Sequence, residues 1–259
     1  MDEKERRNRL ADDQQTVFRL GINEYNASLL RFWQENGMLK PSAKVIDIGC
    51  GVGKYGTYLA ELGFDVTLTD FSAEMLSRAK VNMAPYKTPW QVFQCDFHKA
   101  TGIEPVFARG FDLAISTMSP AICDVETVRK MSAMTHGWCF LARFYEFRQP
   151  LRERILSEVR EEAMPLHGDT QGDCASMIRC VEEAGYTPLI TYTDYDWADQ
   201  RTPDQMSRYL LDRCFPCAED PSAIYEELLQ ITRSLAEADG MLNDTVYTKV
   251  AWIRWKTEE

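Results

Sequence analysis

One glycine-rich loop and three carboxylates, each in or at the end of an apolar run, are the residues best suited to bind a small ligand. Asp47 lies just before the loop, Asp70 closes the run 64–70, and Asp96 closes the run 90–96. The glycines of residues 49–56 let the backbone turn sharply and approach a ligand where any Cβ would clash. A carboxylate can accept hydrogen bonds from a ribose diol or from an exocyclic amine. The pattern therefore predicts a nucleotide site.

The elements around the loop are those that such a site needs. Val45, Ile46 and Ile48 are apolar and β-branched, which is typical of the end of a buried strand. The segment 54–62 then predicts a helix that ends at Gly63. The loop would join a strand to a helix N-terminus, which is a nucleotide-binding geometry.

Two kinds of cofactor could use this loop. Residues 51–56 satisfy the dinucleotide pattern G-x-G-x-x-G, which favours an NAD-type cofactor, and a glycine turn without a ligand is the plainer alternative. Asp47 would repel a pyrophosphate and favours a cationic ligand group. Asp70 suits any ribose. Asp96, with Phe71 and Phe97 to flank a ring, favours an adenine held through its amine.

Residues 43–145 resemble the class I S-adenosylmethionine-dependent methyltransferases. The resemblance rests on the loop D-x-G-x-G-x-G at residues 47–53, on Asp70 and the run 70–76, and on Cys95-Asp96. It implies a Rossmann-like, doubly wound α/β sheet of seven strands whose last strand is antiparallel. It also implies S-adenosylmethionine as cofactor, bound by Asp47, Gly49, Gly51, Gly53, Asp70, Phe71, Asp96, Phe97 and Thr117. In this family Asp70 would hold the ribose, Asp96 the adenine amine, and the backbone of Thr117 the methionine ammonium.

Three residues are candidates for the acceptor side of the reaction. His98 could act as a general base near neutral pH, although it could also be an ordinary loop histidine. Ser119 could touch the acceptor: it stands before Pro120 where enzymes of this family that methylate amide or base nitrogens often carry an Asn or Asp followed by two prolines and an aromatic residue, a signature absent here. Tyr25, with Trp33, lies on a helix predicted from residues 17 to 33, which would cover either the cofactor or only the sheet.

The remaining chain predicts one domain over residues 1–259, with an N-terminal helical cover in residues 1–40. Further strands are expected at 111–118, 137–144, 186–195 and 246–255. Residues 202–240 predict a helical insertion between strands six and seven, with one helix capped by Thr202 and the other by Asp220. We expect this insertion to cover the acceptor, although it could pack only on the sheet or on another subunit.

Composition narrows the possible partners. A net charge of −11 disfavours nucleic acid as the acceptor. No apolar run approaches the roughly 20 residues that span a bilayer, so we expect a cytoplasmic protein without a membrane partner. A small-molecule acceptor and a monomer or homodimer are expected. NAD-dependent oxidoreduction and non-catalytic cofactor binding are the alternatives to methyl transfer.

Eight cysteines are expected to be reduced in a chain of this kind. Four of them were considered for a zinc site, but they lack a second closely spaced pair, so no metal is expected. The other four lie in or beside expected strands and are predicted to be packing residues. The first set is Cys174, Cys180, Cys214 and Cys217, and the second is Cys50, Cys95, Cys123 and Cys139.

Overall fold

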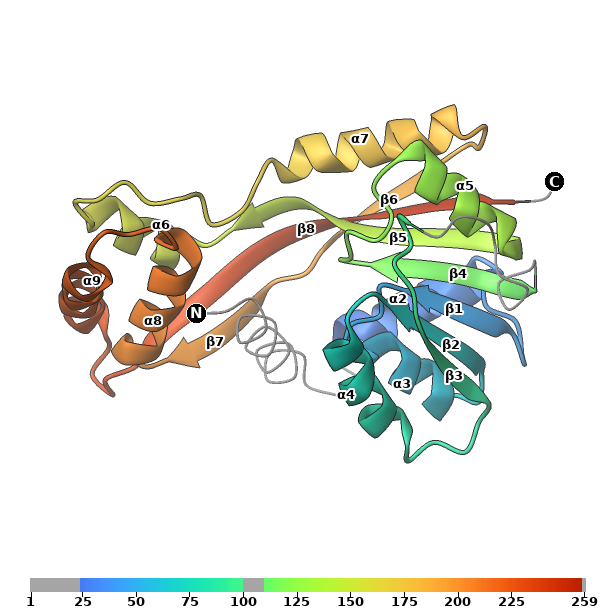
Figure 1. Ribbon diagram of the computed structural model, residues 1–259, viewed down its shortest axis with the longest axis horizontal. Coiled ribbons are helices and arrows are strands. Elements are labelled where there is room, and N and C mark those ends of the chain that lie inside the picture. The colour runs from blue at the N-terminus through green and yellow to red at the C-terminus, as the bar shows by residue number, and fades with distance from the viewer. Residues whose placement is uncertain (1–23, 100–109, 258–259) are drawn as a thin grey trace. The chain divides into compact units, whose positions relative to one another are not determined.

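The computed structural model describes residues 24–99 and 110–257 (Figure 1). Where the sequence predicts one domain, the chain forms two compact units. The first contains the described residues up to Arg143, with 175–191 and 251–257, and the second contains 144–174 and 192–250. Two long strands, β5 (Thr135–Arg148) and β8 (Leu242–Lys256), belong in part to each unit. No helix among the described residues has the length and apolar character needed to cross a membrane.

The first unit is built on a sheet with the order β3-β2-β1-β4-β5-β8-β6. Its other strands are β1 (Lys44–Ile48), β2 (Asp65–Asp70), β3 (Trp90–Gln94), β4 (Phe111–Thr117) and β6 (Leu189–Asp194). The pairs β1–β2, β2–β3, β1–β4 and β4–β5 are parallel, and the last strand, β8, is antiparallel. The predicted Rossmann-like fold is confirmed. The order reverses between β1 and β4, where ligands bind in such sheets.

The core of this sheet follows from its apolar strands. Val45, Ile46 and Ile48 are fully buried, as expected for a parallel strand covered on both faces. The helices of this unit are α2 (Glu24–Glu35), α3 (Lys54–Glu61), α4 (Ala73–Met83) and α5 (Val125–Ala133), and α7 (Thr170–Glu183) begins in the second unit. Ser72 caps α4, since its side chain accepts a hydrogen bond from the amide of Met75.

The predicted N-terminal helix is seen as α2, whereas its expected first part, residues 17–23, lies outside the described residues. Trp33 is buried and packs edge-on against Phe140, with ring centroids 5.3 Å apart. Tyr25 is buried as well, and its hydroxyl accepts a hydrogen bond from the indole of Trp252 at 3.2 Å. The helix therefore packs on the sheet through its aromatic side chains.

The second unit contains the predicted helical insertion together with α6 (Pro150–Glu158). Its helices α8 (Pro203–Cys214) and α9 (Pro221–Leu235) begin where the sequence predicts, because Thr202 and Asp220 cap them. Their inner faces form one apolar cluster with α6. An eighth strand was not predicted: β7 (Trp197–Arg201) pairs antiparallel with β8. Arg152 and Asp244 form a buried ion pair in this unit, with Nη2 and Oδ2 2.5 Å apart.

Candidate functional site

A cavity of about 460 Å³ opens at the carboxyl ends of β1, β2, β3 and β4, in the first unit. Nine of the predicted site residues line it: Gly49, Gly51, Asp70, Phe71, Asp96, Phe97, His98, Thr117 and Ser119. Its volume falls within the range of about 300–1,000 Å³ that is usual for small-molecule sites. Segments from four different strands therefore converge on one cavity.

The loop after β1 is held by its neighbours in the sheet. The amides of Gly49 and Cys50 both donate to the carbonyl of Thr69, at 2.8 and 2.9 Å. Gly53 does not line the cavity; its φ is +81°, it is the N-cap residue of α3, and a Cβ there would lie 3.2 Å from the Cβ of Ala79. Gly53 therefore closes the turn, whereas Gly49 and Gly51 form the cavity wall.

Gly49 is the point of closest backbone approach. Its φ is +73°, and a Cβ at this position would lie 1.9 Å from the Oγ of Ser119. Only glycine fits between the β1 loop and the β4 loop here, since the conformation and the space both exclude a side chain.

Asp70 is fixed by two backbone amides. Its Oδ2 accepts a hydrogen bond from the amide of Gly51 and its Oδ1 from the amide of Ser72, each at 2.9 Å. The side chain is buried and lines the cavity. Each carboxylate oxygen keeps a second lone pair, so the group can still accept hydrogen bonds from a ligand.

Asp47 is buried behind the cavity wall rather than in it. Its Oδ2 has no hydrogen-bond partner among the described residues, and the amides of the nearby glycine loop donate to Thr69 and Asp70 instead. Burial, followed by the nearby charge of Asp70, raises the pKa of Asp47 to about 8. The same causes, burial first and then these two carboxylates, raise the pKa of Cys50 well above its usual value.

Lys54 is a cavity residue that the sequence argument missed. It is the first residue of α3, is only 9% exposed, and lines the cavity. Burial lowers the pKa of its ammonium to about 8. A helix N-terminus and an ammonium both attract negative charge. Its place directly after Gly53 in the loop was the signal that could have identified it.

The residues expected around an adenine differ in exposure. Phe97 is buried, whereas Phe71 is 55% exposed. The Asp96 carboxylate pairs with the ammonium of Lys99 at 2.9 Å. The hydrogen bond from Lys99 is the main cause of the lowered pKa of Asp96, so the carboxylate stays charged at neutral pH.

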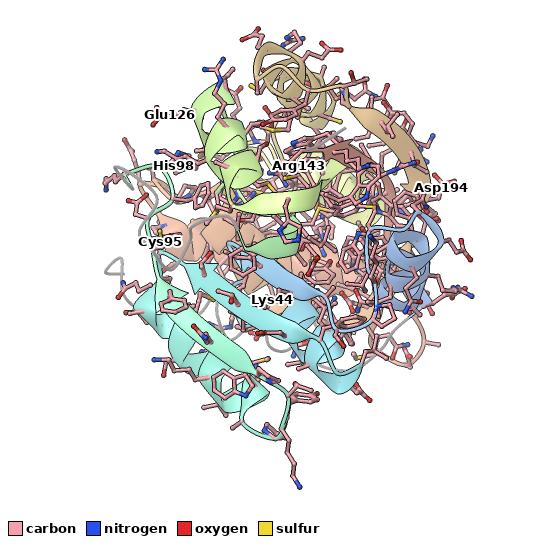
Figure 2. The ribbon with its side chains drawn as sticks, turned by 90° about the vertical axis from the view of Figure 1, so that its right-hand side faces the viewer. Lys44, Cys95, His98, Glu126, Arg143 and Asp194 are labelled. Carbon is pink, nitrogen blue, oxygen red and sulfur yellow. The ribbon has the colours of Figure 1, made fainter. Side chains whose placement is uncertain are left out.

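The loop after β4 carries Ser119 and turns at an unusual residue. Met118 has φ +50°, in the left-handed region that non-glycine residues seldom adopt. Arg143 of β5 (Figure 2) supports this loop, since its guanidinium donates to the carbonyls of Ser116, Ala142 and Ile122 at 2.9–3.2 Å.

His98 lies where the segment after β3 meets this loop (Figure 2). Its Nε2 is 3.3 Å from the carbonyl oxygen of Pro120, and its Nδ1 is 3.7 Å from the sulfur of Cys123. Cys123 was predicted to be a packing residue, and this is wrong, because the side chain is exposed. The helix that follows begins two residues later, at Val125, so the cysteine stays in the loop.

The structure does not bring every predicted residue to the cavity. Tyr25 is not among the described residues that line it, and it packs on Trp252 instead. The four cysteines considered for a zinc site form no metal-binding group in the part of the chain that the structure describes. Two of them, Cys174 and Cys214, are buried.

The comparisons with known proteins concern this same region. Residues 45–139 match the model of a family described as methyltransferase domain. A putative methyltransferase of Bacillus subtilis, YqeM, is 36% identical over 69 residues. That match covers 27% of this chain and 28% of the relative, so the chain matches little more than a quarter of that relative's length.

Solved structures share the fold over most of the chain. An S-adenosylmethionine-dependent methyltransferase of Thiobacillus denitrificans, bound to S-adenosylhomocysteine, has a TM-score of 0.51 at 14% identity, and the match covers 97% and 98% of the two chains. A phosphoethanolamine N-methyltransferase of Haemonchus contortus has a TM-score of 0.53 at 15% identity, covering 96% of this chain and 57% of that one.

The sequence match ends within β5, and so includes the glycine loop, the acid that ends β2, the acid that follows β3, and the β4 loop. These are the segments that form the cavity. Residues 45–139 therefore match a methyltransferase domain, in agreement with the resemblance of this region to the class I S-adenosylmethionine-dependent methyltransferases.

Proposed function

We propose that this protein transfers the methyl group of S-adenosylmethionine to a small-molecule acceptor. The observation that carries the proposal is the convergence of the glycine loop, Asp70 and Asp96 on one cavity of about 460 Å³. The family of residues 45–139 supports the reaction type. The acceptor class is our inference from the net charge of −11, which disfavours polyanionic acceptors.

The residues present fit this cofactor. Asp70 offers free lone pairs to a ribose diol, and the charged carboxylate of Asp96 suits an adenine amine. Lys54, at the N-terminus of α3, suits the carboxylate of the methionine part. The glycine at position 49 allows the ligand to lie against the backbone, as a bulky sulfonium group requires.

Methyl transfer requires little from the protein beyond positioning the acceptor against the cofactor. The bound cofactor supplies a methyl group that its sulfonium already activates, so the acceptor atom must be held in line with it and shielded from water. Positioning of this kind is worth about 7–11 kcal/mol of the barrier. Ser119 is suited to hold an acceptor by hydrogen bonding, and His98 to remove its proton where it needs a base.

Cofactor choice is tested by calorimetry of the full chain with S-adenosylhomocysteine and, separately, with NAD. We expect binding of the first and none of the second. Asp70→Asn should weaken binding, whereas Asp65→Asn, at the opposite end of the same strand β2, should not. Binding of NAD alone would support the oxidoreductase alternative and refute the proposal.

Catalysis is tested by a screen of small-molecule acceptors with cofactor labelled in the methyl group. Transfer of label that is lost in Asp70→Asn supports the proposal. Tight binding of S-adenosylhomocysteine without transfer to any acceptor would favour a non-catalytic binding protein.

The role of residues 202–240 as a cover for the acceptor stays a prediction from sequence. Replacing them with a short turn and measuring binding and turnover separately would test it. Lost turnover with retained cofactor binding supports the prediction, and retained turnover contradicts it.

A further inference from the structure

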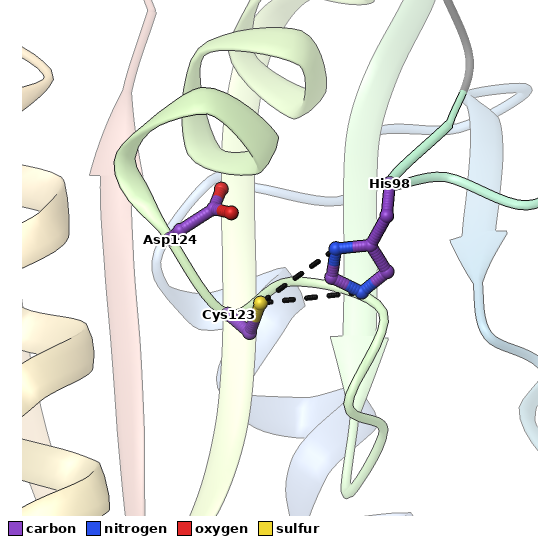
Figure 3. A group of neighbouring side chains, drawn as sticks. All are labelled: His98, Cys123 and Asp124. Atoms are coloured by element: carbon purple, nitrogen blue, oxygen red, sulfur yellow. Dashed lines mark hydrogen bonds between the residues drawn. The ribbon is translucent and has the colours of Figure 1, made fainter.

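Three side chains at the edge of the cavity form a group with metal-ligand spacing, and only one of them, His98, is given a part in the proposed methyl transfer. His98, Cys123 and Asp124 each offer one ligand atom, and these atoms lie within 4.8 Å of one another (Figure 3). They come from two separate segments, the loop after β3 and the loop before α5. Among the described residues no other group of histidine, cysteine and acidic side chains meets this spacing.

The distances from the Cys123 sulfur to the two ring nitrogens of His98 fit two ligands of one metal ion better than they fit a direct hydrogen bond. The Cys123 sulfur is 3.7 Å from Nδ1 and 3.9 Å from Nε2, so neither ring nitrogen is aimed at it alone. At the usual zinc bond lengths, a nitrogen and a sulfur on one tetrahedral ion lie about 3.6 Å apart. The side chains therefore have room for an ion between them with small rotations.

The surroundings already orient each ligand. The Nε2 of His98 lies 3.3 Å from the carbonyl of Pro120, and a proton donated there leaves the lone pair of Nδ1 for an ion. Oδ1 of Asp124 accepts hydrogen bonds from the amide and the hydroxyl of Thr127, both at 2.8 Å.

The backbone that carries the group is held as well. The guanidinium of Arg143 donates to the carbonyl of Ile122, next to the cysteine. The ammonium of Lys130 donates to the carbonyl of His98 at 3.3 Å, and its charge is paired with Glu126 at 2.9 Å. An imidazole, a thiolate and a carboxylate are together the ligand set that zinc prefers.

We propose that His98, Cys123 and Asp124 bind a zinc ion at the edge of the cofactor cavity. Binding releases the proton of the Cys123 thiol to solvent, because the thiolate is the ligand. Three protein ligands leave one position of a tetrahedral ion for water or another donor. The proposal concerns binding alone and does not depend on methyl transfer.

The test is titration of the metal-free full chain with Zn²⁺ by calorimetry, and with Co²⁺ by absorption. We expect one equivalent to bind and a thiolate-to-cobalt charge-transfer band to appear. Cys123→Ser should remove the band. His98→Ala and Cys123→Ser should weaken Zn²⁺ binding by more than about 10–100-fold, the loss seen when only a residue that orients a metal ligand is removed.

Asp124→Asn separates metal binding from folding, because asparagine caps a helix as well as aspartate does. It should weaken Zn²⁺ binding and leave the circular dichroism spectrum unchanged. Cys217→Ser is the matched control, since this cysteine is also exposed but lies in the second unit. The proposal is wrong if the parent binds no Zn²⁺, if Cys217→Ser loses as much affinity as Cys123→Ser, or if binding survives in His98→Ala.

Discussion

Gly49→Ala is the substitution whose cost can be worked out most directly from the structure. A side chain at φ +73° costs about 1–2 kcal/mol for the left-handed conformation alone. The new Cβ would also lie 1.9 Å from the Oγ and 2.8 Å from the Cβ of Ser119, far inside ordinary contact. Overpacking of this kind adds about 1–3 kcal/mol. We therefore expect the free energy of unfolding to fall by about 2–5 kcal/mol.

Gly37→Ala is the matched control for the backbone term. Its φ is +66°, close to that of Gly49, and no heavy atom lies within 4 Å of the Cβ it would gain. The free energy of unfolding of this variant should fall only by the conformational cost of about 1–2 kcal/mol. The excess loss in Gly49→Ala then measures the contact between the β1 loop and the β4 loop.

The assay is urea-induced unfolding of the two single variants, of Ser119→Gly and of the double variant Gly49→Ala/Ser119→Gly. Ser119→Gly removes both clashing atoms, so the double variant should lose much less than the sum of the two single variants. Binding of S-adenosylhomocysteine should fall in Gly49→Ala and stay unchanged in Gly37→Ala. Equal losses of stability in Gly49→Ala and Gly37→Ala would refute the close approach.

Three other substitutions test separate parts of the structure. Asp70→Ala should weaken binding of S-adenosylhomocysteine, since each charge-assisted hydrogen bond to the ribose is worth about 1.5–3 kcal/mol; calorimetry showing parental affinity would contradict the assignment. Burial raises the pKa of Asp47 to about 8, so the folded state keeps a proton that the unfolded state releases above about pH 4. The free energy of unfolding should therefore fall by up to about 1.4 kcal/mol per pH unit between about pH 4 and 8, and Asp47→Asn should flatten this slope in urea unfolding; an unchanged slope would show that another group titrates. Arg152→Met should cost about 3–5 kcal/mol by leaving Asp244 buried beside only the more distant Arg201, and adding Asp244→Leu should restore most of the loss; unfolding without recovery in the double variant would mean that Arg152 acts mainly by packing.

The parts of the fold that depend on neighbours in sequence could be predicted well. Thr202 and Asp220 could be identified as helix caps because a cap accepts a hydrogen bond from an amide two or three residues away, so the whole interaction is visible in the sequence. Local patterns can still mislead by one residue. Residues 170–173 resemble a capping box that begins at Thr170, but Asp169 accepts the hydrogen bond from the Gly172 amide, and Thr170 donates to the carbonyl of Tyr145.

The parts that depend on distant partners could not be predicted. Strand β7 (Trp197–Arg201) is short and largely polar, and it is a strand because β8 pairs with it. The cofactor wall could be predicted, since the carboxyl ends of parallel strands meet at one edge. His98 and Cys123 are 25 positions apart in sequence, and they meet because of the paths of two loops. The spacing of residues in the sequence does not predict such a contact.

The hydrogen bonds from Arg143 to the β4 loop bear on which residues beside the cavity can be substituted. In the contacts described above, the guanidinium binds the backbone carbonyls of Ser116, Ala142 and Ile122, and every residue type offers such a carbonyl. These three hydrogen bonds therefore do not depend on which side chains residues 116, 122 and 142 carry. Arg143 in this way holds both ends of the β4 loop, at Ser116 and Ile122, through backbone atoms. Redesign of the residues between these two positions can begin with the ends of the loop fixed.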